Sequence, residues 1–222
     1  MLNELDHELE RRGHKFVRYA DDMVIFCKSK ASAKQTLAHI IPYIEKKLFL
    51  KVNREKTIAA HASKIKFLGY GFYNGKGGFS CCVHEKSKAK LKDKVRELTK
   101  RNKPISKTEW QRCIKLLIRG WVNYYKLANM LGFLKEVDAH LHRRIRMRIW
   151  KGWKRVRTRY KELKKLGLTH VQAIKCANIR SGYWVASGCA YVQMALSDCR
   201  LSYDGFDCFH DYYKAIRMKK QR

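Results

Sequence analysis

Two adjacent carboxylates, Asp21 and Asp22, lie between the apolar runs FVRYA and MVIFC near the start of the chain. This pattern is typical of a β-hairpin with a tight acidic connection. Carboxylate oxygens are the ligands that Mg²⁺ prefers, and two rigid strands would hold both side chains in place. Metal ions held in this way can activate a 3′-hydroxyl and stabilise a leaving pyrophosphate. The alternative interpretation is that both aspartates serve only the turn.

The remainder of the chain is strongly basic, with 50 Lys and Arg against 19 Asp and Glu, a net charge of +31. Residues 1–80 carry a net charge of +7 and residues 81–222 carry +24. An ordinary mixed-charge surface has a net charge of magnitude about 2 to 8. Because an excess this large repels itself unless a polyanion neutralises it, we expect nucleic acid to be the partner.

The densest basic segment is LHRRIRMRIWKGWKRVRTRYK, residues 141–161, which contains no acidic residue. A merely solvated helix face would normally include acidic residues, so this composition favours contact with RNA phosphates. The leading candidates for that contact are Arg143, Arg144, Arg146, Lys151, Lys154 and Arg155.

The elements that must position these residues differ between the two parts of the chain. Residues 1–83 predict a helix over 1–12, the acidic hairpin, and a helix from Ser32 to about Lys47 disturbed by Pro42. LKVNREKT predicts a strand that leaves into a loop, and IKFLGYGFYNGKGGFSCCV predicts a second hairpin. Residues 84–222 show helical periodicity throughout. They predict helices over 86–100, from a cap at Thr108, from about 135 to 165 with a bend at Gly152, over THVQAIKCAN and over 207–218. The fold class is therefore α+β with an all-helical second part.

Three of these segments occur in an order known from one family. RYADD, LKVNREKT and KFLGYGF resemble motif C, motif D and the primer grip of reverse transcriptases. IRGWVNYYKLANM is similar to the signature of the group II intron maturase-specific domain. WKGWKRVRTRYKELKKLGL, ANIRSGYW and YDGFDCFHDYY resemble the terminal part of bacterial group II intron-encoded proteins, which belong to mobile genetic elements. The resemblance implies the second half of a polymerase palm in residues 1–83, and a thumb with the maturase-specific domain in residues 84–222.

The resemblance also implies roles for single residues. Asp21 and Asp22 would bind Mg²⁺, and Tyr19 and Ala20 would lie beside the primer terminus or the incoming nucleotide. Lys56 would approach the triphosphate as a general acid, although a solvated loop lysine is the alternative. The primer grip would consist of Phe67, Leu68, Gly69 and Tyr70. The implied partners are group II intron RNA and an RNA template with its DNA primer.

Complete family members begin with fingers and a first palm half that carries a third metal-binding aspartate. We therefore expect that this chain alone does not polymerise DNA, and that the missing half is a partner. Two other functions compete with an RNA-directed DNA polymerase. One is a non-enzymatic maturase remnant that assists RNA splicing, and the other is a generic basic nucleic-acid-binding protein. The three polymerase motifs in order disfavour the last.

Other polar residues point to no further site. The eight cysteines form no CxxC pair, which argues against a zinc site and a disulfide framework and favours small core residues in a reducing cytosol. His140, His142 and His170 lack metal-ligand spacing and acidic partners, and they are assigned to the surface or to positions beside RNA. Trp121, Tyr124 and Tyr125 are interpreted as packing residues. No signal peptide and no apolar run of roughly 18–20 residues is found, so we expect a bacterial cytoplasmic protein without a membrane span.

Overall fold

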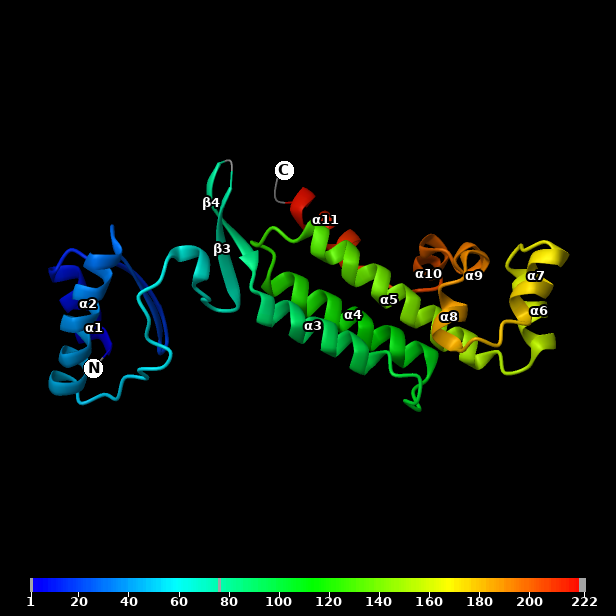
Figure 1. Cartoon of the computed structure of the whole chain (residues 1–222), viewed down its shortest axis with the longest axis horizontal. Coiled ribbons are helices and arrows are strands. Elements are labelled where there is room, and N and C mark those ends of the chain that lie inside the picture. Colours follow the sequence, from blue (N-terminus) through cyan, green and yellow to red (C-terminus); the bar gives the residue numbers. More distant parts are fainter. Residues whose placement is uncertain (1, 76, 220–222) are drawn as a thin grey trace. The chain divides into compact units, whose positions relative to one another are not determined.

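A computed structural model describes residues 2–75 and 77–219. The chain forms two compact units, Met1–His84 and Glu85–Arg222, which are described separately (Figure 1). The first unit combines helices with two antiparallel hairpins, and the second unit is helical. The predicted α+β fold class with a helical second part is confirmed.

The first hairpin packs on two helices. Helix α1 (Leu2–Arg11) leads into strands β1 (Lys15–Tyr19) and β2 (Asp22–Phe26), and helix α2 (Lys30–Pro42) follows. Their shared core consists of four buried residues, Leu5, Leu9, Ile40 and Leu48, and the hairpin adds Phe16, Met23 and Ile25 to it. Each fully buried leucine contributes about 2 kcal/mol relative to an exposed one. This core fixes the hairpin to α1 and α2.

Helix α2 begins and ends differently from the prediction. Its N-cap is Ser29 instead of Ser32, because the Ser29 hydroxyl accepts a hydrogen bond from the Ser32 backbone N–H at 3.1 Å. The α-helical pattern ends at Pro42, which has no backbone N–H to donate, and a π-helical turn, η1 (Tyr43–Lys47), continues the chain. The predicted disturbance at Pro42 is confirmed.

The strand predicted at the start of LKVNREKT is wrong, whereas the loop predicted to follow it is confirmed. Residues 48–61 are all described and form no strand. Asn53 organises a turn there, because its side-chain Oδ1 accepts from the Lys56 N–H at 3.1 Å and its carbonyl accepts from the Thr57 N–H at 3.0 Å. Asparagine side chains favour such turns over extended backbone. A short 3₁₀ helix, η2 (Ala62–Lys64), follows.

The second predicted hairpin is confirmed. Strand β3 (Tyr70–Gly75) pairs antiparallel with β4 (Gly78–Val83), in a register that places Gly75 opposite Gly78. Of the predicted NGKGG turn, Lys76 lies outside the described residues. Gly78 has φ of +101°, a conformation that favours glycine and explains its place at the start of β4.

The second unit is built on helices α3 (Glu85–Leu98), α4 (Lys107–Tyr124) and α5 (Leu131–Gly152), which lie side by side in Figure 1. Within the described residues, six shorter helices follow, of which the last packs on α4 and α5. They are α6 (Val156–Lys165), α7 (His170–Ala177), α8 (Tyr183–Ser187), α9 (Ala190–Ala195), α10 (Asp198–Tyr203) and α11 (Phe209–Lys219). Leu91, Ile118 and Ile145 are fully buried and form the centre of this unit.

Several helix boundaries in this unit correct the prediction. The N-cap of α4 is Ser106, whose hydroxyl accepts from the Glu109 N–H at 3.2 Å, instead of Thr108. The long helix predicted from 135 to 165 breaks after Gly152 and resumes at Val156, so the predicted bend is a break. Helices α7, with its capping box of Thr169 and Gln172, and α11 confirm the two later predictions.

The aromatic residues of α4 behave in two ways. Trp121 packs against Tyr125 and Phe209, with ring centroids 4.7 and 6.3 Å apart. Tyr124 is 55 % exposed, so its interpretation as a packing residue is wrong. The buried stripe of α4 runs instead through Trp110, Ile114, Ile118 and Val122, four residues apart. None of the helices that the structure describes has the length and apolar composition needed to cross a membrane.

Candidate functional site

The acidic pair lies at the tip of the first hairpin. Tyr19 pairs with Asp22, so Ala20 and Asp21 are the two connecting residues. Ala20 has φ of +51°, in the left-handed region that costs a residue with a Cβ about 1 kcal/mol. Asp21 and Asp22 are exposed, and Tyr19 is 65 % exposed. The hairpin therefore presents two neighbouring carboxylates and an aromatic ring to solvent.

Arg18 connects this tip to α1 through hydrogen bonds. Its Nε donates to Oδ1 of Asp6 at 2.8 Å, and its Nη1 donates to the carbonyl of Ala20 at 3.3 Å. The hydrogen bond from Arg18 lowers the pKa of Asp6 below its usual value. Sequence reasoning missed this contact. The available signal was a charged residue inside an otherwise apolar strand, which requires a partner on the helix that the strand covers.

The two carboxylates suit a hard cation such as Mg²⁺, because the metal binds oxygen donors and retains waters or substrate phosphates in its remaining positions. Within residues 2–75 and 77–219, no group of three or more His, Cys, Asp or Glu side chains could hold a metal ion. Asp21 and Asp22 therefore fit as part of a ligand set that other oxygen donors must complete.

Two other predicted groups lie elsewhere in the same unit. Lys56 is exposed on the turn that Asn53 organises, and no hydrogen bond or ion pair between described residues joins it to Asp21 or Asp22. The predicted primer-grip residues form a tight turn in which Phe67 and Tyr70 exchange backbone hydrogen bonds of 3.1 and 2.8 Å. The two central residues, Leu68 and Gly69, have φ of +50° and +81°, as a type I′ turn requires. Gly69 thus belongs to a turn and not to a strand.

Several basic side chains of α5 are half-buried and contact other segments of the second unit. Arg143 donates through Nη2 to the Trp184 carbonyl at 3.1 Å, and its guanidinium lies 4.0 Å from the centroid of the Trp184 ring. Arg144 donates to the Arg96 carbonyl at 3.1 Å, and Lys151 donates to the Arg101 carbonyl at 3.0 Å. These carbonyls lie near the ends of helices, where backbone acceptors have no intrahelical partner. Three predicted RNA ligands thus serve as internal donors.

Arg146 corrects the prediction outright. Its side chain is only 6 % exposed. It donates through Nε to the Leu196 carbonyl at 2.7 Å and forms an ion pair with Asp198. A guanidinium held in this way cannot reach an RNA phosphate, because it is buried and two of its nitrogens already donate to protein groups.

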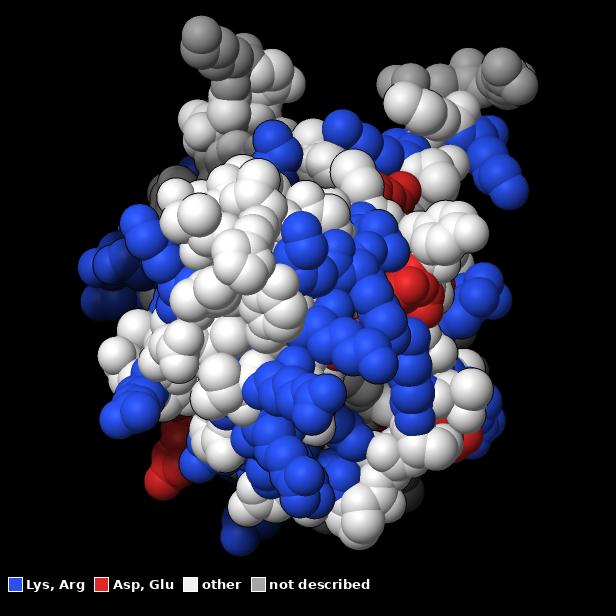
Figure 2. Space-filling model, turned by 90° about the vertical axis from the view of Figure 1, so that its right-hand side faces the viewer, with Lys and Arg blue, Asp and Glu red and all other residues white. Residues whose placement is uncertain are grey.

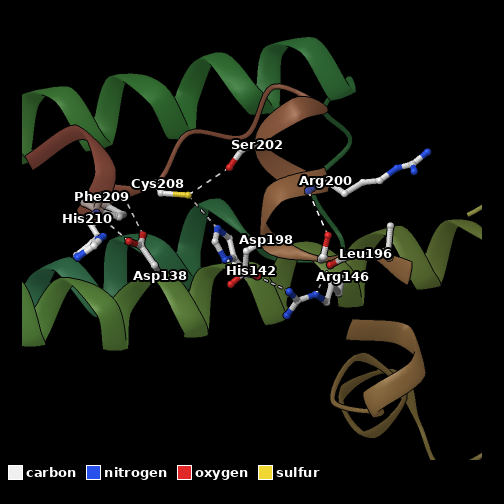
Figure 3. A network of polar contacts seen from close by, with 11 residues as sticks. Asp138, His142, Arg146, Leu196, Asp198, Arg200, Ser202, Cys208, Phe209 and His210 are labelled. Atoms are coloured by element: carbon white, nitrogen blue, oxygen red, sulfur yellow. Dashed lines mark hydrogen bonds and ion pairs between the residues drawn. The ribbon is translucent and has the colours of Figure 1, made fainter. Parts of the chain in front are cut away.

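Arg146 belongs to a buried polar row on α5, together with Asp138 and His142, each four residues from the next (Figure 3). Asp138 accepts hydrogen bonds from the backbone N–H groups of Phe209 at 2.9 Å and His210 at 2.8 Å, and so satisfies the first turn of α11. Burial raises the pKa of Asp138 to about 6, and the two N–H groups oppose that rise.

His142 was assigned to the surface, and this is wrong because the ring is 3 % exposed. Its Nδ1 lies 2.9 Å from Oδ1 of Asp198, and its Nε2 lies 3.3 Å from Sγ of Cys208. Burial lowers the pKa of His142 and raises the pKa of the Cys208 thiol to about 11. The ring is therefore neutral at pH 7, and the protonated thiol can donate to Nε2. Through these contacts the buried polar row holds α10 and α11 on α5.

Exposed cations gather on α6 and just before it. We call these residues the α6 cation cluster: Lys154, Arg155, Arg157, Lys161 and Lys164. No ion pair or side-chain hydrogen bond to any described residue occupies them. Figure 2 views the end of the molecule that carries α6 and α7, where Lys and Arg form a broad band with few acidic side chains. Of the predicted RNA ligands, Lys154 and Arg155 belong to this cluster.

Comparison with protein families assigns both units. Residues 1–72 match the family described as reverse transcriptase (RNA-dependent DNA polymerase), and residues 88–167 match the group II intron, maturase-specific domain. The chain belongs to the group II intron reverse transcriptase and maturase family. No curated protein matches the chain.

The reverse transcriptase match contains the acidic hairpin, Lys56 and the turn at residues 67–70. The maturase-specific match contains most of α3, all of α4 to α6 and, with them, the α6 cation cluster. Helices α7 to α11 follow the matched range. The polar row on α5 therefore connects the maturase-specific domain to helices α10 and α11, which lie beyond the matched range.

Proposed function

We propose that this chain binds group II intron RNA through the α6 cation cluster and assists its splicing. We further propose that it contributes Asp21 and Asp22 to the Mg²⁺-dependent copying of RNA into DNA. The observation that carries RNA binding is the division of the basic residues of the second unit. Arg143, Arg144 and Arg146 contact protein groups, whereas the α6 cation cluster has no protein partner.

The arrangement of the cluster suits a phosphate backbone. Arg157, Lys161 and Lys164 are spaced by four and three residues, so they share one face of α6. Glu162, the one acidic residue of α6, forms an ion pair with Lys165 at 3.0 Å. The positive charges of Arg157, Lys161 and Lys164 are therefore not neutralised by an acidic residue of α6. Cations without protein partners break no internal hydrogen bond or ion pair when they bind phosphate, and each contact releases counterions from the RNA. RNA binding therefore requires no rearrangement of the unit.

For DNA synthesis, each residue at the hairpin tip has a proposed task. Asp21 and Asp22 would hold Mg²⁺, which when bound activates the primer hydroxyl and neutralises the departing pyrophosphate. Tyr19 and Ala20 would contact the primer terminus or nucleotide, and the turn from Phe67 to Tyr70 would support the primer. Lys56 would donate a proton to the leaving group. The support is the exposure of Tyr19, Asp21, Asp22 and Lys56, together with the reverse transcriptase match.

A non-enzymatic maturase is the second candidate function. It is favoured by the absence, within the part of the chain that the structure describes, of a third carboxylate, His or Cys beside Asp21 and Asp22. The α6 cation cluster lies in the second unit, so RNA binding by this cluster does not require Asp21 and Asp22 in the first unit. Splicing of intron RNA that survives the Asp21→Ala substitution would support the maturase role independently of polymerisation.

The proposal is tested by titrating a labelled group II intron RNA with the purified chain at several salt concentrations. Each released phosphate contact should contribute a slope of about −0.7 to −0.9 in log affinity against log salt. Five contacts from the α6 cation cluster predict a total slope of roughly −4. An affinity that is independent of salt would refute phosphate binding by this cluster.

A further inference from the structure

Two thiols face each other in the segment that follows α6. Cys176 lies near the end of α7, and Cys189 is the N-cap residue of α9. Their Sγ atoms are 3.8 Å apart, and both cysteines are free thiols. A disulfide bond needs a sulfur separation of about 2.05 Å. The sulfurs must therefore approach by less than about 2 Å, a distance that side-chain rotation and a small shift of a short connection can supply.

The two thiols differ in their access to solvent. Cys176 is 1 % exposed, whereas Cys189 is half-buried. Burial, and then the contact with Cys189, raise the pKa of the Cys176 thiol well above its usual value. Cys176 is therefore protonated and shielded at neutral pH, and a small oxidant meets Cys189 first.

The chain between the two thiols has a structural task. It contains α8, whose Trp184 carbonyl and ring receive Arg143. It also contains Gly188, which lies directly against the Arg143 guanidinium. Contacts of α7 and α8 with α9 hold the two ends of this segment together. A covalent link between residues 176 and 189 would close a short loop that contains α8. It would thereby hold Trp184 and Gly188 in contact with Arg143.

We propose that Cys176 and Cys189 are a redox modification site, at which a peroxide converts the dithiol into a reversible disulfide. The Cys189 sulfur attacks one peroxide oxygen, so that an S–O bond forms, the O–O bond breaks and water leaves. The Cys176 sulfur then attacks the Cys189 sulfur, so that the S–S bond forms and the S–O bond breaks. The proton of Cys176 leaves with the hydroxyl group as a second water. The peroxide is thereby reduced to two waters while the two thiols lose two electrons, and a dithiol reductant reverses the change.

The proposal is independent of RNA binding, and its direct test is chemical. The purified chain is treated with hydrogen peroxide, its remaining thiols are alkylated, and it is digested with trypsin without reductant. We expect a linked pair of peptides, residues 176–180 joined to residues 181–200, lighter than their sum by two hydrogen atoms. The link should disappear after reduction with dithiothreitol and in the Cys176→Ser and Cys189→Ser variants.

Cys199 provides the matched control, because it is exposed and lies on the same tryptic peptide as Cys189. The Cys199→Ser variant should retain the link in full. A link that requires Cys199, or a peroxide-treated sample in which Cys199 is oxidised while residues 176 and 189 remain unlinked, would overturn the proposal.

A second readout does not depend on substitution of the buried thiol. Closing a loop of this length restricts the unfolded chain, so the oxidised protein should unfold at a temperature higher by about 5 °C. The increase should vanish when the reductant is added. Equal unfolding temperatures for the oxidised and reduced chains would contradict a disulfide that joins α7 to α9.

Discussion

The guanidinium of Arg143 lies so close to Gly188 that a Cβ atom at this glycine would be only 2.7 Å from the Nη2 atom. Gly188 has an ordinary negative φ, so space and not backbone conformation requires glycine there. The contact lets a residue of α5 reach across to α8, where it donates to the Trp184 carbonyl. Arg143, which the sequence predicts to contact RNA, thus contributes to the fold instead.

We predict that the Gly188→Ala substitution lowers the free energy of unfolding of the second unit by about 1–2 kcal/mol. The arginine must withdraw and lose one hydrogen bond and its stacking on Trp184. Tryptophan fluorescence during urea unfolding measures this directly, because all five tryptophans lie in the second unit. Gly120→Ala in α4 is the matched control and should be neutral or stabilising, since nothing lies within 4 Å of its Cβ position. An equal loss for Gly188→Ala in an Arg143→Met background would contradict the explanation.

The pKa of Asp138 predicts a specific dependence of stability on pH. In the folded chain this pKa is about 6, above the ordinary value of 3.8, so folding favours the protonated carboxyl. The stability supplied by the protonated form is therefore complete below about pH 4 and declines as the pH rises to about 6. Because one pKa unit is worth about 1.4 kcal/mol, the decline amounts to about 3 kcal/mol.

The Asp138→Asn variant should lack this component. We expect the difference in unfolding free energy between the native chain and the variant to change by about 3 kcal/mol between pH 4 and pH 7, measured by tryptophan fluorescence. Asp93→Asn on α3 is the control, because the Asp93 side chain is 70 % exposed. A constant difference across this pH range would exclude Asp138 as the titrating group.

The hairpin tip offers a test of backbone strain. Replacing Ala20 by glycine removes the cost of φ at +51°, so the β1–β2 hairpin should gain roughly 0.5–1 kcal/mol. Amide hydrogen exchange of residues 15–26, followed by mass spectrometry, should slow accordingly. Ala20→Val should have the opposite effect, since a branched side chain fits this region least. Faster exchange in the glycine variant would show that the alanine is not strained.

The two hairpins could be predicted from the sequence, whereas the contacts of the buried polar row on α5 could not. RYADD and the second hairpin were predictable, because their contacts join residues close in sequence and their turn residues determine the pairing. The role of Arg146 was not, because its partners Leu196 and Asp198 follow about fifty residues later. Asp138, His142 and Arg146 do show a spacing of four, which marks a shared face of a helix. Only the position of the C-terminal helices shows that this face is buried.

The acidic pair yields a prediction about DNA synthesis. We expect the purified 222-residue chain alone to give no primer extension with Mg²⁺ and an RNA template. The reason is that its described residues bring no third metal-binding side chain to Asp21 and Asp22. Template copying that requires Mg²⁺ and disappears in the Asp21→Ala variant would contradict this expectation, and it would show that the acidic pair suffices.

We expect RNA to be bound by the α6 cation cluster and not by the arginines of α5. The most direct measurement compares the salt dependence of RNA affinity for the native chain and for the variant Arg157→Gln, Lys161→Gln and Lys164→Gln. A control variant, Lys30→Gln, Lys34→Gln and Lys46→Gln, removes the same charge from exposed positions of the first unit. We expect the slope of log affinity against log salt to become shallower by about 2–3 in the α6 variant and to change by less than about 1 in the control. Equal slopes in the native chain and the α6 variant would contradict it.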